Sequence, residues 1–184
     1  MSGHNKWSQI KRRKGASDAA RSRLFSRYSR LITIEAKKAG GVLSAPGLSA
    51  AINRAKTENM PKDSIERAIL KGSSNDSDTL EEVIYEAYGP GGVALIIDAL
   101  TDNKNRTTPE IKHLLSKQGI EVSPPGAAVW AFTKIDGVFS PNKPLIPLSL
   151  DDEEKLTETL EALDEHEDVQ RVFTNAEGYE NSGD

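Results

Sequence analysis

The polar segment SSNDSD at residues 73–78 divides the chain into two parts with different apolar patterns. Before it, apolar residues recur every three to four positions, which is typical of helices that bury one face. After it, alternating or continuous apolar runs bounded by turn residues are typical of strands. We therefore predict a helical domain over residues 1–76 and an α+β domain over residues 77–177. We expect residues 178–184 to form a disordered tail.

The two parts also carry opposite charge. Residues 1–72 contain 16 of the 24 Lys and Arg but only 5 of the 28 Asp and Glu, whereas residues 73–184 contain 8 basic and 23 acidic residues. The formal net charge of −4 conceals this segregation. A strongly basic segment beside an acidic one favours a nucleic-acid or other polyanionic partner for the basic segment.

Several classes of site are not supported by the composition. The chain has no cysteine, so it has neither disulfides nor thiolate metal ligands, and its three histidines are far apart. We therefore expect no metal and no cofactor. No apolar run approaches the ~20 residues that span a bilayer. The N-terminus lacks the apolar region of a signal peptide but is Arg-rich and acid-poor, so mitochondrial or plastid import is the alternative to an expected cytoplasmic location.

In the first part, Ser17 and Asp18 provide capping chemistry for a helix that we expect to run to Lys38. A second helix carries apolar residues from position 48 to 55, and a third runs over Pro61–Lys71. In the second part we expect strands over 82–87, 93–100, 127–133, 137–139 and 169–174, and helices over 109–117 and 151–165. The predicted fold class is α+β: a basic three-helix domain, then a mostly antiparallel sheet with helices on one face.

The glycine loop at residues 89–92 permits two interpretations. Glycine loops can cradle phosphate through backbone N–H groups. This loop, however, joins two predicted strands and lacks the Lys-Ser/Thr pair of a phosphate-binding loop. We therefore expect a structural hairpin with residues at positive φ.

Basic residues concentrate in the N-terminal arm and the first helix, where they can neutralise phosphates. Arg23, Arg27 and Arg30 have i, i+4, i+7 spacing and should share one exposed side. Trp7 lies among cations and can stack on an unpaired base, although a solvated basic face with Trp7 packed inward is the alternative. Asp102 and Asn105 fit a structural role in the turn before the 109–117 helix. The predicted nucleic-acid contacts are Lys6, Trp7, Lys11, Arg12, Arg13, Lys14, Arg21, Arg23, Arg27, Arg30, Lys62, Lys104 and Arg106.

Longer motifs resemble a known family. The stretch GHNKWSQIKRRK, followed by Asp18, Arg21, Phe25 and Arg30, resembles the N-terminal signature of the YebC family. That family includes mitochondrial translational activators of cytochrome c oxidase subunit I. Its pattern also resembles AINRAKTENMPKDSIERAI, YEAYGPGGVALIIDALTDNKNRT, EIKHLLSKQG and LDEHEDVQRVFTNAE. The resemblance covers nearly all of residues 1–136 and 145–177. Its signature begins directly after Met1, so we expect no additional presequence.

The resemblance implies a helical first domain and a second domain that a third one interrupts. Family members usually carry an extra α/β domain between the strand matching AVWAFTK and the final strand-helix-strand. Here, Lys134 and Pro147 are separated by about a dozen residues, too few for a domain. We therefore expect this insertion to be absent near residues 137–146, with the two halves of the second domain joined directly.

The resemblance also implies a function. Family members are associated with translation at the ribosome, where they ease elongation through stretches such as consecutive prolines, and many are labelled probable transcriptional regulators. We predict a monomeric translation factor that docks on ribosomal RNA, has no membrane partner and takes no small-molecule substrate. A DNA-binding transcriptional regulator, and a scaffold that uses the acidic helix, are the alternatives. No Ser-His-Asp set, cysteine nucleophile or HExxH motif supports an enzyme.

Overall fold

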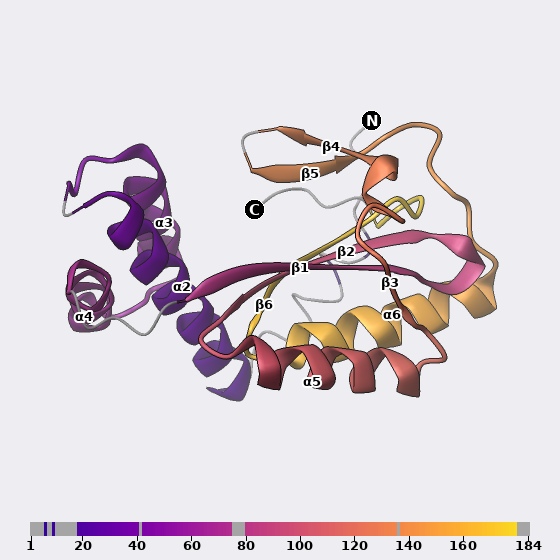
Figure 1. Cartoon of the computed structure of the whole chain (residues 1–184), viewed down its shortest axis with the longest axis horizontal. Helices are drawn as coiled ribbons and strands as arrows, with labels where there is room; N and C mark the ends of the chain where they lie inside the picture. The colour runs from indigo at the N-terminus through magenta and orange to yellow at the C-terminus, as the bar shows by residue number, and fades with distance from the viewer. Residues whose placement is uncertain are drawn as a thin grey trace.

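The computed structural model describes residues 6, 9, 18–40, 42–74, 80–135 and 137–179. Within these residues a bundle of helices stands beside an α+β unit, as Figure 1 shows. The predicted fold class is confirmed, including the mostly antiparallel sheet with helices on one face.

The helical part contains α2 (Asp18–Lys38), α3 (Pro46–Thr57) and α4 (Lys62–Ser73). The apolar stripe of each helix meets the other two in a core built around Ile32, Leu48 and Ile65. Helix α4 approaches α2 closely at Gly72, where a Cβ atom would overlap the Thr33 carbonyl oxygen. Glycine is therefore required at this crossing.

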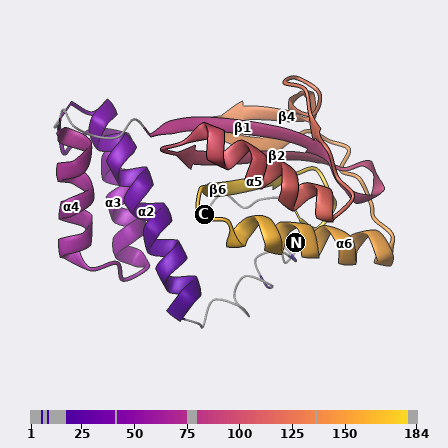
Figure 2. The same cartoon turned by 60° about the horizontal axis from the view of Figure 1, so that its bottom comes forward.

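The main sheet has the strand order β3-β1-β2-β6, and every neighbouring pair is antiparallel. Its strands are β1 (Glu81–Tyr88), β2 (Ala94–Thr101), β3 (Val122–Ser123) and β6 (Val169–Thr174). Helices α5 (Lys104–Lys117) and α6 (Leu150–Glu165) cover one face (Figure 2). The hairpin of β4 (Phe132–Ile135) and β5 (Val138–Pro141) lies over the other face (Figure 1).

Strand β2 is buried on both sides. Leu95 and Ile97 join the core beneath α5 and α6, whereas Ala94 and Ile96 join the core beneath the β4–β5 hairpin. Because successive residues of a strand point to opposite faces, burial on both sides requires a continuous apolar run. The sequence ALII at the start of β2 is that run.

The Gly89–Gly92 turn joins β1 to β2, and Gly91 and Gly92 have φ of 66° and 77°. The predicted hairpin with positive φ is confirmed. The predicted start of α5 at Pro109 is wrong, because the helix begins at Lys104. The Asn103 side chain accepts a hydrogen bond from the Arg106 backbone N–H and thereby caps the helix five residues earlier.

Two further expectations are corrected. Residues 127–133 were expected to form one strand, but they form a turn, a short 3-10 helix (Val129–Ala131) and only the beginning of β4. The buried Glu86 carboxylate causes this, because it accepts backbone N–H bonds from Gly126, Ala128 and Val129 that would otherwise be available to a neighbouring strand. Disorder from residue 178 is also wrong for Tyr179, which packs against α6 with 4% of its surface exposed. Residues 180–184 lie outside the described residues.

Candidate nucleic-acid interface

The predicted arginine row of α2 faces the α+β part of the chain. Arg27 is buried, and its Nη1 lies 2.9 Å from Asp164 Oδ1 at the end of α6. Its Nη2 also donates to the Asp164 carbonyl oxygen. A guanidinium held at two points by one residue is largely removed from solvent, so Arg27 is positioned to join the two parts of the chain.

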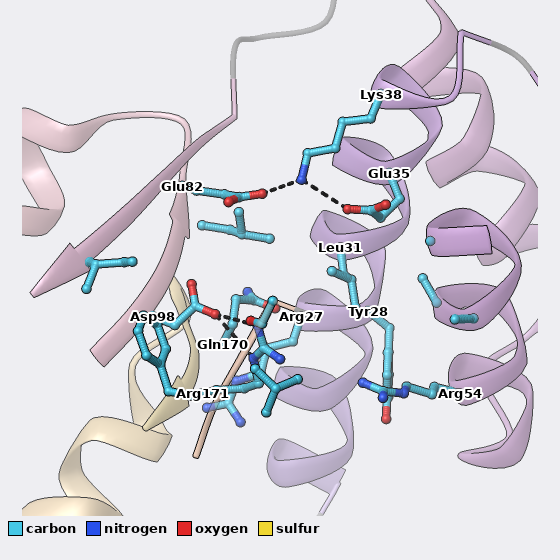
Figure 3. Close-up of a pocket in the computed structure, with 18 of the residues that line it drawn as sticks. Arg27, Tyr28, Leu31, Glu35, Lys38, Arg54, Glu82, Asp98, Gln170 and Arg171 are labelled. Atoms are coloured by element: carbon cyan, nitrogen blue, oxygen red, sulfur yellow. Dashed lines mark hydrogen bonds and ion pairs between the residues drawn. The ribbon is translucent and has the colours of Figure 1, made fainter. Parts of the chain in front are cut away.

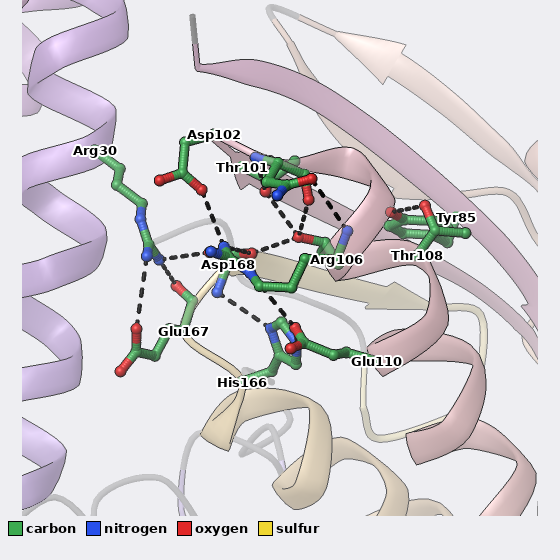
Figure 4. A network of polar contacts seen from close by, with 12 residues as sticks. Arg30, Tyr85, Thr101, Asp102, Arg106, Thr108, Glu110, His166, Glu167 and Asp168 are labelled. Atoms are coloured by element: carbon green, nitrogen blue, oxygen red, sulfur yellow. Dashed lines mark hydrogen bonds and ion pairs between the residues drawn. The ribbon is translucent and has the colours of Figure 1, made fainter. Parts of the chain in front are cut away.

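Arg30, one turn later, reaches the loop between α6 and β6. Its Nη1 lies 3.0 Å from Asp168 Oδ1, an ion pair that is not aligned as a hydrogen bond. Asp168 is 1% exposed and accepts hydrogen bonds from Arg106 Nη2 at 2.9 Å and Thr107 Oγ1 at 2.6 Å (Figure 4). One buried carboxylate therefore connects α2 to the start of α5.

These contacts shift the pKa of Asp168. Burial alone would raise it, but the Thr107 hydroxyl, the Arg106 guanidinium and the nearby Arg30 charge stabilise the ionised form more strongly. The pKa therefore lies below its usual value of 3.8. The carboxylate remains charged at neutral pH and keeps both arginines paired.

Two lysines continue the same pattern. Lys38, at the end of α2, forms ion pairs with Glu82 on β1 and with Glu35. Lys6 forms an ion pair with Glu153 of α6, and its ammonium lies 5.9 Å from the centre of the Tyr179 ring. Its backbone N–H also donates to the Gly178 carbonyl oxygen.

The thirteen predicted contact residues therefore fall into three groups. Lys6, Arg27, Arg30 and Arg106 are engaged by acidic groups of the α+β part. Arg21, Arg23 and Lys104 have no ion pair within the described residues, while Lys62 lies 3.5 Å from Glu66 and is 85% exposed. The remaining five, Trp7, Lys11, Arg12, Arg13 and Lys14, lie outside the described residues.

A groove between α2 and α4 brings together cations and hydroxyls that the sequence analysis did not single out. Its volume is about 390 Å³, and its rim carries Arg67 and Lys71. Four serine hydroxyls and the Phe25 side chain also line it; the serines are Ser22, Ser26, Ser29 and Ser64. Hydroxyls and cations together are the usual side-chain ligands of backbone phosphates. The i, i+4 spacing of Arg67 and Lys71, on the side of α4 away from Ile65, is the signal that could have identified them.

The groove and the arginine row occupy different sides of α2. At 100° per residue, Ser22, Ser26 and Ser29 form one stripe, and Arg27 and Arg30 form another about a third of a turn away. Among the described residues, the ion pairs of these two stripes with the α+β part come from the arginine stripe and not from the groove. Within residues 18–74, Lys37, Arg54 and Lys56 are also exposed and have no ion pair.

Other site classes find no support in the described part of the chain. Among those residues, no three His, Asp or Glu side chains are grouped so as to hold a metal ion. None of the helices described is both long enough and apolar enough to cross a membrane.

Two family models match this sequence. Residues 5–75 match the TACO1/YebC protein N-terminal domain, and residues 80–143 match the TACO1/YebC second and third domain. The chain is also similar to curated proteins that are each named probable transcriptional regulatory protein. It is 44% identical over 187 residues to one from Petrotoga mobilis, an alignment that covers 96% of this chain and 71% of the relative.

Three other comparisons agree. A relative from Desulfatibacillum aliphaticivorans is 46% identical over 98% of this chain and 73% of its own length, and one from Fervidobacterium nodosum is 50% identical over 73% and 54%. The alignments thus span between about half and three quarters of these relatives. Among solved structures, the conserved hypothetical protein Aq1575 from Aquifex aeolicus matches with a TM-score of 0.79 and 28% identity, over 87% of this chain and 91% of that one.

Proposed function

This chain belongs to the TACO1/YebC family, and from that membership and its charged surfaces we propose that it is a nucleic-acid-binding regulator. The helical part is the contact surface. The observation that carries the proposal is the open α2–α4 groove, where Arg67 and Lys71 lie beside four serine hydroxyls. The naming of the relatives as transcriptional regulatory proteins supports the same class of partner.

The chemistry of this surface suits the phosphate backbone better than base edges. Lys and Arg near phosphates release condensed counterions, which gives salt-dependent affinity with little sequence preference. Residues 73–184 carry 23 acidic residues and repel the same backbone. Only the helical side can therefore approach the ligand, and the acidic part sets the orientation of the bound protein.

The finer proposal is that the ligand is ribosomal RNA and that binding assists elongation, for example through proline-rich stretches. The resemblance to translational activators supports this role. Folded RNA also presents closely spaced phosphates from more than one strand, which suits a surface with cations distributed over several helices. A DNA-binding transcriptional regulator is the second candidate, and the names of the relatives favour it.

Co-sedimentation with ribosomes over a series of salt concentrations, compared with binding to unrelated duplex DNA, separates the two candidates. We expect retention on ribosomes at salt concentrations that already release the protein from duplex DNA. Equal retention on both ligands across the series would favour DNA binding. Failure to bind either polyanion even at low salt would contradict the whole proposal.

A double variant, Arg67→Ala with Lys71→Ala, tests the groove itself. We expect roughly tenfold weaker binding near physiological salt and a salt slope reduced by about 2, because two phosphate contacts are lost. The matched control is Lys112→Ala with Lys117→Ala, which removes two exposed cations of α5. Equal losses in the two double variants would show that total charge, and not the groove, determines affinity.

A further inference from the structure

A second hollow lies between the two parts of the chain. It has a volume of about 410 Å³ and lies between α2 and α3 on one side and the main sheet on the other (Figure 3). Residues of the β4–β5 hairpin also line it. This volume is within the range of about 300–1,000 Å³ that is usual for small-molecule sites. Tyr28 and Leu31 of α2 and Ile84 of β1 give it an apolar wall. Such a wall suits a flat, weakly polar group.

Gln170 enters this cavity because of a β-bulge. On β2, Asp98 pairs with Arg171 and Ala99 pairs with Val169, so Gln170 is the extra residue of β6. A bulge interrupts the alternation of a strand and redirects a side chain. The Gln170 side chain lines the cavity, and its amide nitrogen Nε2 is buried without an acceptor. A buried donor without a partner is costly, so a bulge that maintains one indicates a ligand-binding position.

Arg27 supplies a second donor to the same cavity. The Arg27 side chain is 11% exposed, and its Nη1 and Nη2 are held by Asp164. Its Nε is buried and has no acceptor. Gln170 and Arg27 both line the cavity and carry donor groups of the kind that bind the acceptor atoms at the edge of an unpaired base.

Two cations of the cavity lining have no ion pair within the described residues. Three carboxylates also line it: Lys38 pairs with Glu35 and Glu82, and Arg171 pairs with Asp98. Arg54 and Lys134 are exposed, line the cavity and form no ion pair within the described residues. Lys134 is held over the Phe139 ring, with its ammonium 4.9 Å from the ring centre. These two cations can receive a phosphate group.

We propose that this cavity binds one unpaired nucleotide, with the base against Tyr28, Arg27 and Gln170 and the phosphate at Arg54 and Lys134. The inference deepens the proposed function, on which it rests, because a strand bound by the helical part can supply that nucleotide. A free mononucleotide presents the same chemistry. The experiment therefore includes both sources.

The test uses the full chain and the variant Gln170→Leu. Leucine has a similar size and removes the unpartnered donor, so we expect the unfolding free energy to remain the same or to rise. Calorimetric titrations use the four ribonucleoside monophosphates, with ribose phosphate as the baseless control. Fluorescence anisotropy uses a short labelled single-stranded RNA and its duplex. Gln118→Leu, at the end of α5, is the matched control.

We expect Gln170→Leu to weaken binding about tenfold for the ligand that uses the cavity, while Gln118→Leu leaves it unchanged. Loss of monophosphate binding identifies free nucleotide as the source, and loss confined to single-stranded RNA identifies a base of the strand. Unchanged affinity for every probe, or equal binding of ribose phosphate and the monophosphates, overturns the inference. The groove variant Arg67→Ala with Lys71→Ala is measured in parallel. If it binds RNA like the wild type, the proposed function fails independently of the cavity.

Discussion

Helix α2 has two interfaces of opposite character. Against α4 it is close-packed and apolar, with Ile32, Ala36 and Ala68 in contact and Gly72 at the crossing. Against the α+β part it uses charged side chains, chiefly Arg27 and Arg30 with Asp164 and Asp168. Apolar packing carries no charge for salt to screen or for pH to titrate, whereas ion pairs respond to both. The helical bundle is therefore a fixed unit, and its attachment to the α+β part depends on solution conditions.

The largest expected effect comes from the apolar interface. In Gly72→Ala, the new Cβ would overlap the Thr33 carbonyl oxygen and lie 2.8 Å from the Ala36 Cβ. We expect a loss of about 3 kcal/mol in the free energy of unfolding, because two backbones must separate. Urea denaturation followed by circular dichroism measures it. The loss should be the same at low and high salt, and Ser73→Ala, at an exposed neighbour, should have little effect.

The charged interface should yield a smaller, salt-dependent effect. Asp168→Asn removes the charge that Arg30 and Arg106 share and weakens the Thr107 hydrogen bond. We expect a loss of about 2 kcal/mol, measured by urea denaturation. Glu167→Gln is the matched control, since its carboxylate is 73% exposed and lies 3.6 Å from Arg30. Equal losses in the two variants would contradict a special role for the buried carboxylate.

The pH dependence of the free energy of unfolding should distinguish the charged interface from the apolar one. The pKa of Asp168 is lower in the folded state than its usual 3.8, so the stabilisation from its charge is complete above that pH. It is lost as the pH falls from 3.8 through the lowered value, because over that window the unfolded chain binds a proton that the folded protein does not. Glu86, whose pKa three backbone N–H groups lower, adds to the same slope. We expect unfolding free energy to fall less steeply below pH 3.8 in Asp168→Asn than in the wild type.

The smallest effect is expected at the exposed end of the charged interface. Lys38 and Glu82 have side chains that are 53% and 52% exposed. Their ion pair is screened by solvent, so Lys38→Ala should change the free energy of unfolding by less than about 0.5 kcal/mol. A loss as large as that of Asp168→Asn would mean that the contribution of each ion pair to stability does not depend on how deeply the pair is buried. The same urea titrations decide this.

The elements in which apolar residues recur regularly over many positions could be predicted from the sequence. Helices α2 and α6 and strands β1, β2 and β6 have such periods, and their ends are close to those expected. Local rules failed at residues 127–133, because the Glu86 carboxylate, about forty residues away, binds the backbone there. They also failed at the start of α5. Pro109 indicates the first turn of a helix, but the helix begins at Lys104, directly after the Asn103 cap.

The candidate site was predictable only as a charge distribution. The basic character of α2 follows from its sequence, but the engagement of Arg27 and Arg30 depends on acidic residues more than a hundred positions later. The groove depends on how α4 packs on α2, and the Gln170 donor depends on a single bulge. Each of these is a tertiary feature, so periodicity and composition contain no record of it.

Strand β6 pairs with β2 over a separation of more than seventy residues. A ribosome synthesises the chain from its N-terminus, so β2 has no neighbour on that edge until nearly the whole protein has emerged. The partners of Arg27 and Arg30, at positions 164 and 168, emerge equally late. We therefore expect the nascent chain to display a folded basic bundle with free arginines, and the cavity beside Gln170 to close only at the end of synthesis.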